Sequence, residues 1–297
     1  MKRLLFILIV SALLIGLAWF IPHSMFNITV QTSSDTTVST PTAPALGEVT
    51  EPSGSTPTLE PLPTPHNIPV SFENLSFSIP EGFAYGFEGI NLPAVEGPMG
   101  AAPAGIQVTL TGFPFPVEEP YFNPKVRVYP ADEYTAVSDW ASESLKRLKY
   151  VLANPSESFS NDRLPNVAFM GSTAQLYASQ VKMLEFQNGK GVRMISAYAQ
   201  FPAPIGRKGS FYHYEGLTND GKYYVVVEIP VDLPVYSDSS NAGEFGITYP
   251  ADRLVPAEMD AYYAAVTQLI NDASPDGFNP ILHQIDLLVQ SINVTVK

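Results

Sequence analysis

Residues 211–229, FYHYEGLTNDGKYYVVVEI, decide the fold that the sequence predicts. Apolar and aromatic residues predominate on both sides of Asp220-Gly221, a dipeptide typical of a two-residue hairpin turn. Counting outward from that turn places His213 opposite Glu228, with Glu215 two residues away on the same face. The opposite face is predicted to meet the core and carries Tyr212, Tyr214, Val225, Val227 and Ile229.

The surrounding sequence predicts an α+β domain over residues 68–297. A second hairpin, with strands at 175–186 and 192–200, is predicted around Asn188-Gly189. Apolar residues at helical spacing predict two principal helices, at 132–152 and 256–272. Helices segregated around a mainly antiparallel sheet, here a β meander, define the α+β class. Shorter elements are expected as strands at 68–79, 106–111, 125–129 and 289–296 and a helix at 281–288, whereas 84–105 predicts no element.

The N-terminus predicts a membrane anchor. Lys2 and Arg3 precede an uncharged apolar run of 18 residues, 4–21, and no further Lys or Arg occurs before Lys125. At 1.5 Å per residue, such a run spans about 27 Å as a helix, close to the thickness of a bilayer core. Residues 1–28 are therefore predicted to be a single-pass signal anchor with the C-terminal domain outside the cytoplasm. The alternative is a secreted protein cleaved after Gly16-Leu17-Ala18.

Composition sets further bounds. Residues 29–67 are rich in Pro, Thr and Ser and predict a linker between the anchor and the domain. The chain carries 16 Lys and Arg against 29 Asp and Glu, so a nucleic-acid partner is not expected. It contains no cysteine, which excludes disulfides, thiolate zinc sites, cysteine nucleophiles and an N-terminal lipid.

Basic residues do not form a recognisable phosphate-binding motif. The densest basic group, Lys146-Arg147-Lys149, lies on the predicted helix beside Glu143, and we interpret it as a solvated helix face. Lys190 stands between Gly189 and Gly191, without the spacing of a phosphate loop, and is interpreted as part of a turn.

His213, Glu215 and Glu228 form the acid, base and imidazole cluster that the sequence allows us to derive. We interpret it as a polar, solvent-facing cross-strand group, because such pairs commonly stabilise sheets. A catalytic or metal-binding cluster is the alternative, since imidazole and two carboxylates can hold a divalent ion. No Gly-x-Ser-x-Gly motif occurs, and no cofactor is expected.

Aromatic residues crowd the segment before the first helix. Exposed aromatics among Gly and Pro suit a surface that binds sugar, peptide or lipid. Packing in the core is the ordinary alternative. The residues concerned are Phe83, Tyr85, Phe87, Phe113, Phe115, Tyr121 and Phe122.

Two resemblances to known families follow from short motifs. Residues 180–205, QVKMLEFQNGKGVRMISAYAQFPAPI, followed by 214–224, YEGLTNDGKYY, resemble a pattern in uncharacterised exported proteins of bacteria, many of them lipoproteins. That resemblance implies an extracytoplasmic location and no activity, and the missing lipid-bearing cysteine departs from it. Residues 77–83, FSIPEGF, and 287–292, LLVQSI, resemble the opening and closing segments of PsbP-like domains, which implies an α+β sandwich in a non-enzymatic accessory subunit.

The sequence therefore leads to two functional hypotheses. The first is a membrane-anchored, extracytoplasmic binding or accessory protein that is not an enzyme, with an envelope protein, a glycan or a lipid as its partner. The alternative is a cell-envelope hydrolase that uses His213 with Glu215 or Glu228.

Overall fold

The computed structural model describes residues 66–97, 100–114, 123–155, 158–166, 173–236, 246–252 and 254–296. The predicted anchor at 1–28 and nearly all of the predicted linker at 29–67 lie outside the described residues. None of the described helices is long and apolar enough to cross a membrane.

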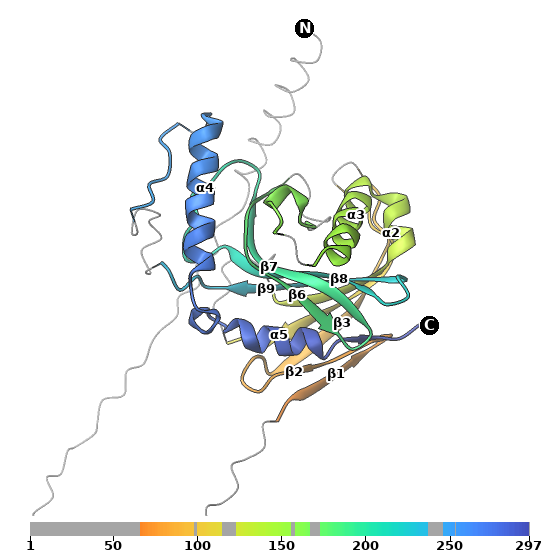
Figure 1. Ribbon diagram of the computed structural model, residues 1–297. Coiled ribbons are helices and arrows are strands. Elements are labelled where there is room, and N and C mark those ends of the chain that lie inside the picture. Colours follow the sequence, from red (N-terminus) through yellow and green to blue (C-terminus); the bar gives the residue numbers. More distant parts are fainter. Residues whose placement is uncertain are drawn as a thin grey trace, which may run out of the picture. The chain divides into compact units, whose positions relative to one another are not determined.

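The described residues form an α+β fold with four α-helices and two antiparallel sheets (Figure 1). The strands are β1 (Ile68–Phe72), β2 (Leu75–Ile79), β3 (Gly86–Leu92), β4 (Gly105–Thr111), β5 (Lys125–Pro130), β6 (Ala174–Phe186), β7 (Gly189–Ala199), β8 (Ser210–Thr218), β9 (Tyr223–Val231) and β10 (Asn293–Val294). The helices are α2 (Ala131–Val137), α3 (Asp139–Ala153), α4 (Pro256–Asn271) and α5 (Leu282–Gln290). The larger sheet has the order β3-β4-β5-β9-β8-β7-β6, and the smaller has the order β1-β2-β10.

The central strands of the larger sheet are buried on both faces. Helices α2 and α3 cover one face and share a hydrophobic core with strands β7, β8 and β9. On the other face, a second core joins the sheet to β1, β2, α4 and α5. Figure 1 shows α2 and α3 on one side of the sheet and α5 with β1 and β2 on the other. Every residue of β8 is consequently buried.

The register of the hairpin at β8 and β9 confirms the prediction, because His213 pairs with Glu228 and Tyr212 with Ile229. The hairpin of β6 and β7 turns one residue earlier than predicted. Phe186 pairs with Gly189, so that the loop is Gln187-Asn188 and Gly189 is the first residue of β7. A Cβ at Gly189 would overlap the ring of Phe186, which explains why this strand position requires glycine.

The prediction of one helix at 132–152 is wrong. Ser138 is extended, with φ −136° and ψ 114°, and divides the segment into α2 and α3. Its hydroxyl accepts a hydrogen bond from the N–H of Ala141 at 3.2 Å and so caps α3. Val137, one of the apolar residues whose spacing predicts that helix, is 48 % exposed at the end of α2. The break lets Tyr134 on α2 pack beside Tyr129, with ring centroids 4.7 Å apart.

Two other segments also differ from the sequence prediction. Residues 84–105 contain β3, whose side chains do not alternate between buried and exposed, so that no period of two marks the strand. At the C-terminus, α5 continues to Gln290, and only Asn293–Val294 form a strand in place of the predicted 289–296. Residues 68–79 form the two strands β1 and β2.

The aromatic segment divides between core and surface. Phe83 is fully buried and its ring meets that of Phe113 edge to face at 5.5 Å. Tyr85 and Phe87 are 74 % and 37 % exposed. The remaining three aromatics of this group, Phe115, Tyr121 and Phe122, lie outside the described residues.

A buried carboxylate joins α5 to the larger sheet. Asp286 on α5 is 3 % exposed and accepts a hydrogen bond from the hydroxyl of Tyr212 at 2.9 Å. The ammonium of Lys182 lies 2.9 Å from its Oδ2, and Nε of Arg193 lies 3.4 Å from its Oδ1. Because these partners come from β6, β7 and β8, this one side chain holds α5 against three strands.

Candidate functional site

The structure brings His213, Glu215 and Glu228 together on one face of the sheet, but it buries them. His213 and Glu215 have no exposed surface, and Glu228 is 6 % exposed. The interpretation of a solvent-facing group is therefore wrong. The physical reason is that α2 and α3 lie over this face, a contact between distant parts of the chain that local alternation does not reveal.

Glu215 is the centre of this buried group. One of its oxygens, Oε2, accepts hydrogen bonds from the hydroxyl of Ser144 on α3, at 2.6 Å, and from the hydroxyl of Tyr224 on β9. Its other oxygen lies 2.9 Å from Nε2 of His213. Burial, and then the charge of Glu215, raise the pKa of Tyr224 well above its ordinary value of 10.0, so the phenol remains a donor. The network links α3 to strands β8 and β9.

Glu228 belongs to a neighbouring ion-pair group on the same face. Its Oε2 lies 3.6 Å from the ammonium of Lys125 and 3.3 Å from the guanidinium of Arg127, both on β5. Burial lowers the pKa of Lys125 below its ordinary value of 10.5, and the attraction of Glu228 opposes that shift. Arg127 also donates to the side-chain oxygen of Gln107 at 2.7 Å. These contacts pair β5 with its neighbours β9 and β4.

This geometry differs from that of a serine hydrolase. In a catalytic triad the imidazole stands between the serine and the carboxylate, where it receives the serine proton. Here the hydroxyl of Ser144 bonds to the carboxylate of Glu215, and the imidazole of His213 lies on the far side of that carboxylate. Ser144 is also fully buried. The arrangement suits a structural network, because a substrate does not reach the group without displacement of α3.

Among the described residues, no group of three or more His, Asp or Glu side chains is placed to hold a metal ion.

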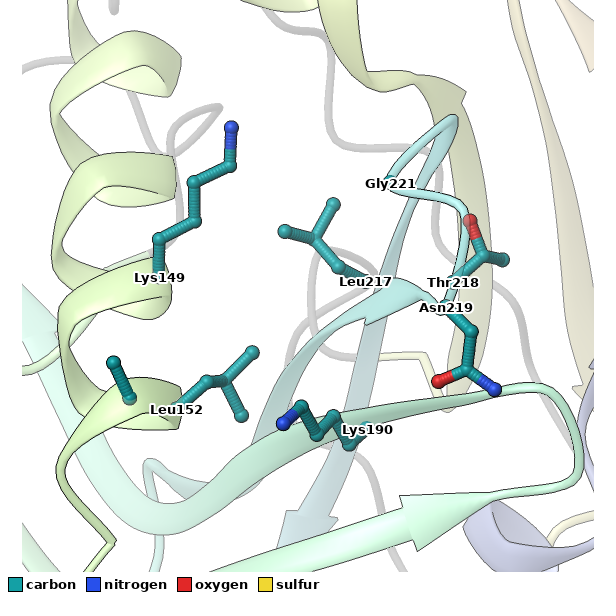
Figure 2. Close-up of a pocket in the computed structure, with 8 residues that line it drawn as sticks. Lys149, Leu152, Lys190, Leu217, Thr218, Asn219 and Gly221 are labelled. Atoms are coloured by element: carbon teal, nitrogen blue, oxygen red, sulfur yellow. The ribbon is translucent and has the colours of Figure 1, made fainter.

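A surface pocket lies beside this network, between the C-terminal part of α3 and the ends of β7, β8 and β9. It encloses about 310 Å³. Figure 2 shows Lys149 and Leu152 on α3, Lys190 on β7 and Leu217 on β8, with the hairpin that follows β8 on the other side. In this view the side chains of Leu152 and Leu217 lie between the two ammonium groups. The lining residues are Lys149, Leu152, Ala153, Lys190, Leu217, Thr218, Asn219 and Gly221.

Among its described lining residues, the pocket has two cations and no acid. Lys149 and Lys190 are exposed, and within the described ranges neither ammonium has a carboxylate within ion-pair distance. The other basic residues of α3 differ: Lys146 and Arg147 lie 3.9 Å and 3.3 Å from carboxylate oxygens of Glu143. The three basic residues interpreted from the sequence as one helix face are thus divided. Lys146 and Arg147 pair with Glu143, and Lys149 lines the pocket.

The turn between β8 and β9, which forms one wall of the pocket, is stabilised by hydrogen bonds to its own side chains. The hydroxyl of Thr218 donates to Asp220 at 2.6 Å, and the N–H of Lys222 donates to the same oxygen at 3.1 Å. These bonds lower the pKa of Asp220 below its ordinary value of 3.8. Gly221 completes the turn with φ +72°, a conformation that glycine adopts without strain. Asp220 is not among the lining residues of the pocket.

Sequence reasoning missed the pocket because its two lysines lie far apart in the chain. The available signals were the position of Lys149 beside the apolar stripe of α3 and the pairing of Lys190 with Leu217 across β7 and β8. No protein-family model matches this chain, and no curated protein matches it.

Proposed function

We propose that this chain is a binding or accessory protein, not an enzyme, held at a membrane with its α+β domain outside the cytoplasm. The N-terminal apolar run after Lys2 and Arg3, followed by a Pro- and Thr-rich stretch, supports the location. The ligand occupies the pocket between α3 and the β8–β9 hairpin.

The observation that carries the proposal is the contrast between the two groups of polar residues. The acid and imidazole groups are closed inside the fold, while the surface pocket offers two ammonium groups, two leucines and a polar hairpin. Concave sites of this kind bind through apolar walls and a few placed polar groups. The burial of His213 and Glu215 weighs against the alternative, a cell-envelope hydrolase.

A photo-crosslinking amino acid in place of Asn219 tests this proposal in the full chain on intact cells. Asn219 is exposed and lines the pocket, whereas Ala264 is exposed on α4 and serves as the control position. We expect illumination to give an adduct of defined mass at position 219 only, and we expect K149Q/K190Q to abolish it. No adduct at 219, or the same adduct at 264, would contradict the proposal.

A further inference from the structure

We infer that the ligand of this pocket is a phosphate monoester that carries an apolar group. This inference rests on the proposed function, because it names the chemical class that the same site accepts. Lys149 and Lys190 hold the phosphate, and Leu152 and Leu217 contact the apolar group.

Charge is the first argument. The chain has 29 acidic residues against 16 basic ones, and yet neither of the two exposed lysines at this pocket has a carboxylate partner among the described residues. Two acids next to the lining residues are not part of the lining: Asp220 is bonded within the hairpin, and Glu185 is the register partner of Lys190 across β6 and β7 but forms no ion pair with it. A bound anion therefore neutralises two charges that the described protein leaves unpaired.

The cations require an anionic ligand. Both cations among the described lining residues are lysines, and lysine binds phosphate as a flexible point charge. A phosphate monoester carries a charge of about −1.5 to −2 at pH 7, which balances two ammonium groups. Each ammonium ends a flexible four-carbon stem, so that its position can adjust to a bound anion.

The apolar side chains in the walls of the pocket are the reason for inferring that the ligand carries an apolar group. Leu217 is 7 % exposed, and together with Leu152 it gives the pocket an apolar surface between the cations in Figure 2. The volume of about 310 Å³ lies at the lower end of the range of about 300–1,000 Å³ that is usual for small-molecule sites. That space holds a phosphate and a short alkyl segment, and a longer chain extends past the open mouth.

Isothermal titration of the full chain in phosphatidylcholine liposomes tests the inference, with hexyl phosphate as the probe. We expect hexyl phosphate to bind and hexanol and hexyltrimethylammonium to bind much more weakly. K149Q/K190Q should weaken binding by about tenfold or more, because two charge-assisted hydrogen bonds are lost. K146Q, which removes the same kind of charge one turn away on α3, should leave the affinity unchanged. Equal binding of hexanol, or an unchanged affinity in K149Q/K190Q, would overturn the inference.

A second arm distinguishes a lipid headgroup from a free ester. Liposomes that contain phosphatidic acid, itself a phosphate monoester, will weaken hexyl phosphate binding if the natural ligand is a lipid, and will leave it unchanged if the ligand is free in solution. Both results support a phosphate monoester. If no probe binds while the adduct at position 219 still forms, the ligand class is wrong and the binding site stands. Loss of both the adduct and probe binding overturns both proposals.

Discussion

Replacement of Glu215 by alanine probes the buried network that fastens α3 to the sheet. The side chain has no exposed surface and receives hydrogen bonds from Ser144 and Tyr224, with His213 in contact on its other side. Truncation removes the acceptor shared by the two buried hydroxyls, which keep only each other at 3.3 Å, and leaves the imidazole without its carboxylate. Such a loss is severe because the desolvation of the remaining groups is no longer compensated.

The expected magnitude follows from these contacts. Each buried polar group left without its partner costs about 1–3 kcal/mol, so that the loss of an acceptor shared by several groups is expected to cost about 3–5 kcal/mol. The whole free energy of unfolding of a typical domain is about 5–15 kcal/mol. Glu215→Gln keeps the volume and one acceptor oxygen, and therefore loses only the charge-assisted part of the bonds, about 1 kcal/mol. Glu185→Ala, at an exposed site on β6, should change stability by less than about 0.5 kcal/mol.

Urea denaturation at pH 7, followed by far-UV circular dichroism, measures these differences. The loss in the free energy of unfolding is expected to be smallest for Glu185→Ala, larger for Glu215→Gln and largest for Glu215→Ala. A loss below about 1 kcal/mol for Glu215→Ala would refute the structural role of the network, since a single ordinary hydrogen bond contributes that much.

Three further changes test other contacts. Asp286→Ala should lower the free energy of unfolding by about 3–5 kcal/mol in the same urea assay, because it leaves a buried guanidinium without its carboxylate; a neutral result would refute the account of α5. Gly191→Ala should cost about 1–3 kcal/mol in thermal denaturation, because a Cβ there would overlap the backbone of β8, and wild-type stability would contradict the packing described. The lowered pKa of Asp220 means that its carboxylate stabilises the hairpin above the ordinary value of 3.8 and that this contribution is lost as the pH falls through the folded-state pKa. Thr218→Val should therefore move the midpoint of the Asp220 carboxyl in an NMR titration up toward 3.8, whereas an unmoved midpoint would exclude the hydroxyl as its cause.

Local patterns predict the hairpins, because turn residues and alternation act between neighbours in the chain. The pairing of His213 with Glu228 follows from Asp220-Gly221 alone. The burial of that pair does not follow, because it depends on α3, which is distant in sequence. The division of the helix at Ser138 is also set by tertiary contacts, since it places Tyr134 against Tyr129.

The pocket is a second feature that neighbouring residues do not predict. Lys149 reaches it from a helix and Lys190 from a strand, and only the docking of α3 on the sheet brings them to one site. The sequence does not predict strand β3 for another reason. Both of its faces are partly exposed, so that the strand is defined by its hydrogen bonds to β4 and not by a hydrophobic period.

The most direct test of the central claim, that the pocket binds a ligand outside the cytoplasm, is the acylation of lysines on intact cells. A membrane-impermeant amine reagent is applied to cells and, separately, to the purified full chain, and labelling is quantified by mass spectrometry. Lys146, which is 71 % exposed and outside the pocket, is the internal reference. The proposal predicts that Lys146 is labelled equally in both samples, while Lys149 and Lys190 are protected on cells. Equal labelling of all three lysines in both samples, or no labelling of Lys146 on cells, would contradict it.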